Sequence, residues 1–366
     1  LVVASVGVRK VDASARYANQ YFAVDWCWRG DLNELEHFRP AKLTDLDCAH
    51  RRRLLVRGSA ARAPTGSLLG MALTVVGSIA YDSVRTPFGN RERMLGGAAT
   101  HFALSASFFD QVRAVGPVGD DFTDEDVAIL ETRGTVTDDV ERVAGGETFF
   151  WAGEYGWDLN SRETLETRLG VFETFEPKLG DESRNAETLF LANIQPDVQY
   201  AVREQCTGAK FVAMDSMDLW IEIANESLRK VISTVDCVIL NDAELRQLTR
   251  KPNLVAAARE VLTWGPKAVV GKQGEYGAAL FTEDGFFSLP AYPLENVIDP
   301  TGAGDTFAGG FVGYVAAHID QEINHDLLVR AMAYGTALAS YNVEEFGTER
   351  VARLAPREVL VRVAEL

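Results

Sequence analysis

The chain has 366 residues, of which 47% are hydrophobic, 10% aromatic and 24% charged, and its formal net charge is −17. This composition is typical of a globular protein with a sizeable core, and the length predicts about two domains, or one large α/β domain with an appendage. The acidic balance and the absence of an apolar run of ~18 residues argue against a nucleic-acid-binding protein, an anionic-membrane surface and a membrane span.

The first 70 residues differ from the rest in charge. They hold 11 Lys and Arg against 7 Asp and Glu, a net of +4, whereas the remaining residues hold 25 and 46, a net of −21. They lack both the apolar run of a secretory signal and the scarcity of acidic residues of a transit peptide. We therefore expect residues 1–70 to be a disordered or artefactual N-terminal extension, for example from a start site assigned upstream of Met71, and residues 71–366 to fold.

Cysteine usage in residues 71–366 indicates a reducing environment. Only Cys206 and Cys237 occur there, with no CxxC motif and no His at metal-ligand spacing. This pattern predicts a cytoplasmic protein without structural zinc.

From residue 73 onward, apolar runs alternate with helical patterns. In chain order they predict strand 73–80, helix 97–109, strand 112–118, helix 122–133, and strands 188–194, 210–215 and 237–241, each of these three followed by a helical stretch. Strands that alternate with helices predict an α/β fold with a mostly parallel central sheet covered on both faces.

Residues 147–159 interrupt this alternation. The segment is aromatic and contains two glycines, which favours an exposed β structure over a helix. Together with residues 81–95 it could form a small separate sheet. The alternative is an ordinary surface hairpin.

The sequence DPTGAGDTFAGG at residues 299–310 carries the clearest chemical signal. Each glycine inside a helix costs ~1 kcal/mol relative to alanine, so several of them indicate that a ligand or neighbour approaches the backbone closely. A glycine-rich turn that opens a helix exposes N–H groups suited to phosphate. Asp305 then fits a base for a hydroxyl that attacks this phosphate, or simply an acidic residue of a first helical turn. No Lys-Ser/Thr follows, so the turn is not a Walker A loop.

This stretch resembles the C-terminal signature of the PfkB (ribokinase-like) family of carbohydrate and nucleoside kinases. Four further motifs resemble the family in the same order, namely GSIAYD at 77–82, Gly96-Gly97, NDAE at 241–244 and VGKQGEYG at 270–277. The resemblance implies a ribokinase-like three-layer α/β/α domain with a mostly parallel sheet and a small β lid at about residues 81–95 and 147–159. It also implies ATP-dependent transfer of the γ-phosphate to a hydroxymethyl group of a sugar or sugar-like molecule.

The resemblance implies roles for the glycine-rich turn. Asp305 would be the general base, a role that contributes ~10²–10⁴-fold to rate. The backbone N–H groups of Gly302, Ala303, Gly304 and Asp305 would form an anion hole for the transferring phosphoryl group. Asp299 and Thr301 match the loop that holds a monovalent cation in many members, and residues 342–347 resemble its partner segment, which implies K⁺ activation.

On the nucleotide side, the resemblance implies that Asn241 and Glu244 hold Mg²⁺ through water. The same pair could be a helix capping box, and both interpretations can hold together. Gly274, Gly277 and Asn241 would lie along ATP, and Lys272 would contact a phosphate. The alternative for Lys272 is a solvated side chain at a strand end.

On the acceptor side, the resemblance implies that Asp82 binds hydroxyl groups and that Gly96 and Gly97 admit the substrate. Ala80 and His101 replace two asparagines that hold ribose in ribokinases, so ribose is disfavoured; His101 would donate to another acceptor or fill the helix face. A nucleoside is the alternative acceptor, because an aromatic set could stack a base: Phe149, Phe150, Trp151, Tyr155 and Trp157.

Two further alternatives are a catalytically silent binding protein of this family, disfavoured by the intact motifs, and a dinucleotide-binding oxidoreductase, which lacks a GxGxxG after the first strand. The lid forms the dimer contact in some relatives, which leaves the oligomeric state open, with a homodimer through the lid as one alternative.

Overall fold

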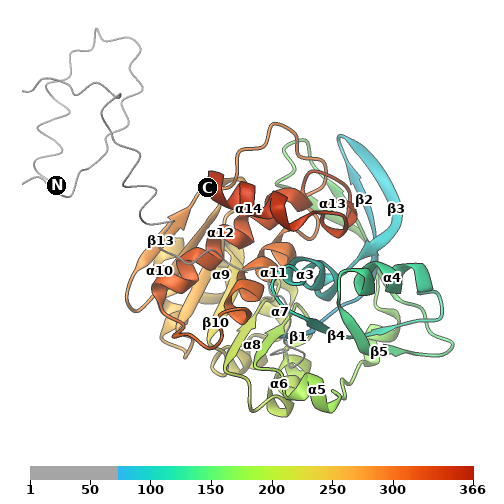
Figure 1. The fold of residues 1–366 in the computed structure, drawn as a ribbon, viewed down its shortest axis with the longest axis horizontal. Coiled ribbons are helices and arrows are strands. Elements are labelled where there is room, and N and C mark those ends of the chain that lie inside the picture. The colour runs from blue at the N-terminus through green and yellow to red at the C-terminus, as the bar shows by residue number, and fades with distance from the viewer. Residues whose placement is uncertain (1–72) are drawn as a thin grey trace, which may run out of the picture. The chain divides into compact units, whose positions relative to one another are not determined.

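The computed structural model describes residues 73–366, and the extension predicted for residues 1–70 lies outside them, as does Met71. The described residues form two β-sheets with covering helices (Figure 1). The strands of the larger sheet are β1 (Leu73–Val76), β4 (Val112–Val118), β5 (Val136–Arg142), β8 (Thr188–Leu191), β9 (Phe211–Met214), β10 (Cys237–Asn241), β11 (Ala268–Lys272), β12 (Ala278–Thr282) and β13 (Phe286–Leu289).

The larger sheet is mostly parallel. Its order is β13-β12-β11-β10-β9-β8-β1-β4-β5 in this part of the chain, with β12 and β13 antiparallel to their neighbours and the other strands parallel. Alternate residues of one strand enter different cores: Cys237 and Ile239 of β10 pack on one side, Val238 and Leu240 on the other. Burial on both faces is why these strands are continuous apolar runs, and it confirms the α/β prediction.

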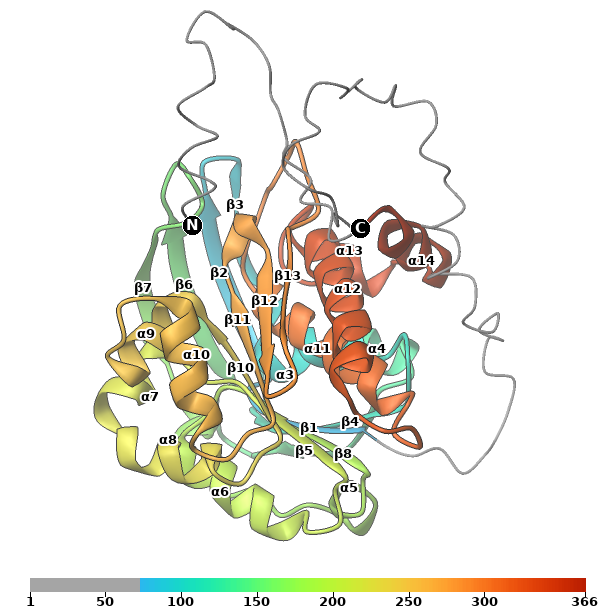
Figure 2. The same ribbon diagram turned by 90° about the vertical axis from the view of Figure 1, so that its left-hand side faces the viewer.

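Helices cover both faces of this sheet (Figure 2). One layer contains α3 (Ala98–Ala106), α4 (Asp124–Thr132), α11 (Ala303–Ala316), α12 (His325–Asn342), α13 (Glu349–Ala352) and α14 (Pro356–Glu365). The other contains α5 (Asp181–Arg184), α6 (Pro196–Gln205), α7 (Asp218–Ile223), α8 (Asn225–Ile232), α9 (Asp242–Thr249) and α10 (Leu254–Leu262). Among residues 73–366, no helix is both long and apolar enough to span a bilayer.

The smaller sheet has the order β3-β2-β6-β7, formed by β2 (Ala80–Thr86), β3 (Gly89–Gly96), β6 (Phe149–Tyr155) and β7 (Arg162–Arg168). β2, β3 and β6 lie within or overlap the segments 81–95 and 147–159. β7 was not predicted, because all of its residues are exposed and no apolar alternation marks it. The strand predicted at 73–80 was too long: β1 ends at Val76, and Ala80 already starts β2 of the other sheet.

Candidate active site

The glycine-rich turn opens α11 as predicted. Gly302 is its N-cap residue with φ 73° and ψ 0°, in the left-handed region, and no side chain caps the helix. Ala303 N–H donates to the Pro300 carbonyl at 3.2 Å, whereas no backbone hydrogen bond within the described chain is donated by the N–H of Gly304 or Asp305. Neither N–H is paired with a backbone carbonyl, but that of Asp305 hydrogen-bonds its own carboxylate, so the N–H of Gly304 is the more available to an anion, and that of Ala303 is already paired.

Asp305 lies half-buried in the first turn of α11. Burial, and secondly the charge of Asp215, raise its pKa from 3.8 to about 7, while Lys272 opposes the shift. A carboxyl group with a pKa near the working pH is suited to act as a general base. The physical environment of Asp305 therefore fits the role that the motif implies.

Asp82 lies at the start of the smaller sheet, against the double glycine. It is buried, and its carboxylate accepts a hydrogen bond from the Gly97 N–H; burial, and then the charge of Asp299, raise its pKa to about 7. A side chain at Gly96 would overlap the Asp82 carboxylate. The structure thus brings together three of the predicted acceptor-side residues, Asp82, Gly96 and Gly97. The charge of Asp305 also raises the pKa of Asp82, so the two carboxyl groups lie near each other.

Lys272 faces the turn and is not a solvated strand-end lysine. Its Nζ donates to Asp215 Oδ2 at 2.8 Å, and 17% of its side chain is exposed. Burial lowers the pKa of Lys272, but Asp215 and Glu244 together hold it above its usual range, so the group stays cationic. The ammonium lies 3.0 Å from where a Gly304 Cβ would stand, and so it borders the turn at Gly304.

Asp215 is a site residue that the sequence analysis missed. It directly follows β9, and its carboxylate pairs with Lys272 at 2.8 Å. The sequence does carry a signal for it. Ligand sites of parallel sheets lie at the carboxyl ends of the strands, and Asp215 follows the carboxyl end of β9.

Asn241 and Glu244 form the capping box of α9. Asn241 Oδ1 accepts from the Glu244 N–H, and Glu244 Oε2 accepts from the Asn241 N–H, both at 2.7 Å. Burial, and then Asp215, raise the pKa of Glu244 to about 7. No group of three His, Cys, Asp or Glu side chains within residues 73–366 could hold a metal alone. The carboxylates of Glu244 and Asp215 nevertheless fit a hydrated Mg²⁺, which would relieve their repulsion.

The two glycines of the β11–β12 turn serve different purposes. Gly277 has φ 96°, and a Cβ there would overlap the Leu289 carbonyl, so it permits the hairpin to pack. Gly274 has φ 56°, and the nearest atom to its Cβ position is Asn160 Oδ1 at 3.8 Å, so space is open beside it. Only Gly274 leaves room for a nucleotide.

Asp299 anchors the start of the glycine-rich turn. Its Oδ1 accepts from the Thr301 N–H and its Oδ2 from the Gly347 N–H, both at 2.9 Å. Asp299 and Thr301 are therefore tied to the segment 342–347, as the predicted pairing of these loops requires.

One face of the smaller sheet points at this turn. Asp82 of β2 is in register with Trp151 of β6, and Tyr155 of β6 with Arg162 of β7, so these side chains share a face. The hydroxyl of Thr301 donates to Tyr155 Oη at 3.1 Å, which fixes that face toward the turn.

The indole of Trp151 lies on that face. A Cβ on Gly153 would overlap its indole, so the ring covers the Gly153 backbone, with the Arg162 guanidinium 5.3 Å from the ring centroid. Arg162 lowers the pKa of both Asp82 and Asp305. Arg162 was not predicted as a site residue, because β7 carries no strand pattern.

Phe149, Trp151 and Tyr155 alternate along β6, so all three lie on the Asp82 face. Phe149 packs against Phe172, Phe150 lies beneath Arg168, and Trp157 is 83% exposed. Of the aromatic set, Trp151 and Tyr155 are therefore the two that contact Arg162 and Thr301 on this face.

His101 lies behind the turn, 2% exposed. Its Nδ1 is 3.1 Å from Asn342 Oδ1, and a Cβ on Gly302 would overlap its ring. The geometry gives it the Gly302 backbone and Asn342 as neighbours, and its contact with the substrate stays a prediction.

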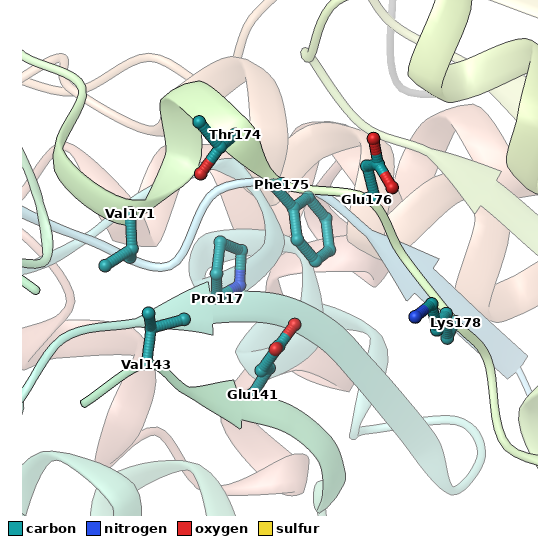
Figure 3. Close-up of a pocket in the computed structure, with 8 residues that line it drawn as sticks. All are labelled: Pro117, Glu141, Val143, Val171, Thr174, Phe175, Glu176 and Lys178. Atoms are coloured by element: carbon teal, nitrogen blue, oxygen red, sulfur yellow. The ribbon is translucent and has the colours of Figure 1, made fainter.

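The cavity drawn in Figure 3 is a different place. It measures about 210 Å³ and is lined by residues that include Pro117, Glu141, Phe175 and Lys178. None of the predicted site residues lines it, so it is not the site assembled above.

Comparisons with known proteins agree with the motifs. A family model described as "pfkB family carbohydrate kinase" matches residues 71–353. A cytidine kinase of Thermococcus kodakarensis is 31% identical over 254 residues, 66% of this chain and 88% of the relative.

Solved structures share the fold. A Burkholderia thailandensis nucleoside kinase in complex with inosine has a TM-score of 0.69 at 20% identity, covering 80% of this chain and 97% of that one. An Arabidopsis thaliana ribokinase complexed with ribose and ATP has a TM-score of 0.64 at 22% identity, covering 81% and 99%. The predicted three-layer α/β/α fold and the family resemblance are confirmed. The chain belongs to the pfkB family of carbohydrate kinases and is a phosphotransferase with an alcohol group as acceptor, of the class that phosphorylates sugars and nucleosides.

Proposed function

We propose that this protein is an ATP-dependent kinase that phosphorylates the hydroxymethyl group of a nucleoside. The observation that carries the choice of acceptor is the indole of Trp151, which lies over Gly153 on the face that also presents Asp82. A nucleoside would place its sugar hydroxyls at Asp82 and stack its base on this ring. The similarity to a cytidine kinase supports the same acceptor class. A free sugar would use Asp82 but would have no base to stack on the indole.

Asp305 acts as the base in the proposed reaction. Its carboxylate accepts the proton of the attacking hydroxyl, while Asp82 orients the acceptor by accepting hydrogen bonds from its other hydroxyls. The N–H groups of Gly304 and Asp305 donate to the oxygens of the phosphoryl group that ATP supplies. Phosphoryl transfer needs little covalent assistance, so positioning and charge stabilisation dominate.

Cationic and metal-binding groups complete the site. Lys272, released in part from Asp215, neutralises charge beside Gly304, and Glu244 with Asn241 would hold Mg²⁺ through water. The smaller sheet acts as a lid that excludes water, fastened by the Tyr155–Thr301 hydrogen bond. K⁺ activation through Asp299 and Thr301, and a homodimer through the smaller sheet, stay predictions.

A turnover screen tests this proposal. Cytidine, other nucleosides, ribose, deoxyribose and hexoses are incubated with ATP and Mg²⁺, with and without K⁺, and phosphorylated products are identified by mass spectrometry. We expect the highest kcat/KM with a nucleoside. Turnover of free sugars alone would refute the acceptor class, and the absence of any product would favour a silent family member.

Replacing Trp151 by Ala should raise KM for the nucleoside by about 10-fold, because stacking of a base on an aromatic ring is worth roughly 1–3 kcal/mol. KM for ATP should stay within about two-fold, because the indole lies on the acceptor side. Steady-state kinetics measure both values. Trp157→Ala is the matched control, since this ring is 83% exposed. An unchanged nucleoside KM in Trp151→Ala would contradict stacking.

Replacing Asp215 by Asn should move the acidic limb of kcat/KM to lower pH. In the wild type, activity should rise with pH through about 7 as Asp305 ionises. Asp215 is the charge that contributes most to this raised pKa after burial, so its neutralisation lowers the pKa and makes the base available in more acidic buffer. The pH–rate profile is compared with that of Asp197→Asn, an exposed position on α6. An unmoved limb would assign it to another group.

A further inference from the structure

Asn342, at the end of α12, holds both ends of the glycine-rich turn. Its Nδ2 donates to the Thr301 carbonyl at 2.7 Å, and its Oδ1 accepts from the Thr306 hydroxyl at 3.0 Å. The side chain is fully buried. The same Oδ1 lies 3.1 Å from His101 Nδ1, so His101 touches the residue that clamps the turn.

The network fixes the protonation of His101. The Thr301 carbonyl requires the Asn342 amide nitrogen on its side, which leaves Oδ1 facing His101, and an oxygen acceptor requires His101 to donate from Nδ1. His101 Nε2 is buried and has no partner among the described residues. Burial also lowers the pKa of His101 to about 4. The imidazole is therefore neutral, with its proton on Nδ1.

The ring of His101 also supports the turn directly. It lies against the backbone of Gly302, where any Cβ would overlap it. Ser105, one turn further along α3, donates to the Thr306 carbonyl at 2.6 Å. The same helix begins at Gly97, whose N–H binds Asp82. One short helix thus touches both the acceptor side and the phosphate side of the site.

We propose that His101 is a positioning residue that acts through Asn342 to hold the turn 301–306, so that the N–H groups of Gly304 and Asp305 point at the transferring phosphoryl group. The inference rests on the proposed kinase reaction. It assigns His101 no contact with the acceptor. It also predicts that the loss of His101 lowers kcat and leaves KM nearly unchanged, because the ground-state complex does not depend on these N–H directions.

Two variants separate hydrogen bonding from bulk. In His101→Asn the amide nitrogen can occupy the place of Nδ1 and keep the donor, whereas in His101→Gln the amide reaches the place of Nε2 and the donor to Asn342 is lost. We expect kcat to fall about 10–10²-fold in His101→Gln, as for a small displacement of positioned groups, and to stay within about three-fold in His101→Asn. KM for acceptor and ATP should change less than two-fold in both (about 0.4 kcal/mol).

A binding measurement is independent of the acceptor. ADP and ADP with aluminium fluoride, both with Mg²⁺, are titrated calorimetrically into wild type and variants. The ratio of the affinity for ADP with aluminium fluoride to the affinity for ADP alone is the preference for the fluoride complex, and it reports the anion hole. This ratio should fall in His101→Gln by about the same factor as kcat. The double variant His101→Gln/Asn342→Ser should be no worse than Asn342→Ser alone, because His101 acts through Asn342. Thermal melts confirm that the compared variants are folded.

The outcomes divide clearly. A raised acceptor KM with unchanged kcat in His101→Gln would make His101 a substrate ligand and overturn the inference. Equal losses of kcat in His101→Gln and His101→Asn would also overturn it. So would additive losses of kcat in the double variant, or an unchanged preference for the fluoride complex in His101→Gln. If the wild type turns over no acceptor but the preference falls as expected in His101→Gln alone, the positioning role is supported and the proposed acceptor is wrong.

Discussion

Asp305→Asn is expected to lower kcat by about 10²–10⁴-fold, the contribution of a positioned general base. The amide is nearly the same size, so the turn and the N–H groups of Gly304 and residue 305 keep their places, and affinity for ATP should stay within about two-fold. Single-turnover measurements with acceptor in excess separate the chemical step from product release. Wild-type turnover in this variant would exclude Asp305 as the base.

The same substitution should stabilise the fold at neutral and alkaline pH. The pKa of Asp305 is raised from 3.8 to about 7, so the folded state holds the proton more tightly than the unfolded chain does. The carboxyl therefore contributes most to stability below about pH 4, and this contribution is lost as pH rises to about 7. A shift of this size corresponds to at most about 4 kcal/mol. An amide, which never ionises, avoids that loss.

Urea unfolding at two pH values tests this stability effect. We expect the free energy of unfolding of Asp305→Asn to exceed that of the wild type by about 2–3 kcal/mol at pH 8, after allowing for the lost attraction to Lys272. At pH 4 the two free energies should be about equal. Asp197→Asn, at an exposed position, is the control and should change neither value. A variant less stable than the wild type at pH 8 would show that the ionised carboxyl is compensated by its surroundings.

The parts of the fold that the sequence predicted are those with local signals. β10 was predicted with its observed bounds because a strand buried on both faces is an apolar run whatever its neighbours are. The turn at Gly302 was recognisable because a left-handed N-cap and a close neighbour both require glycine. β7 was not predictable, because its exposed residues carry no alternation and it exists only by pairing with β6.

Contacts between residues far apart in the sequence could not be predicted either, because they leave no local signal. Asp215 and Lys272 end two strands that are separated by β10 in the sheet, and neither residue indicates the other in the sequence. His101 and Asn342 are 241 positions apart. The sequence indicated which residues belong to the site. The pairing of charges in the site and the side chains that hold the turn depend on the tertiary packing.

Gly302→Ala is expected to lower kcat by about 10²–10³-fold, the size of effect seen when an anion-hole donor is lost. Two strains act together. The backbone at φ 73° disfavours any residue with a Cβ by about 1–2 kcal/mol, and the methyl group would overlap the His101 ring. Overpacking of this kind costs about 1–3 kcal/mol, so the turn should shift and carry the N–H groups of Gly304 and Asp305 out of line.

Three further variants separate these causes, with kcat, fluoride-complex affinity and urea unfolding measured for each. Gly134→Ala carries φ strain alone, because φ is 84° and no atom lies within 4 Å of its Cβ, so it should lose about 1 kcal/mol of stability and no activity. Gly304→Ala meets only the Lys272 ammonium at 3.0 Å, a flexible neighbour, and should be milder than Gly302→Ala. In Gly302→Ala/His101→Ala the overlap disappears but the support of the turn is lost with it. We therefore expect stability to recover in part while kcat stays low; full recovery of kcat would show that steric overlap alone impairs the turn and that the imidazole contributes nothing to its position.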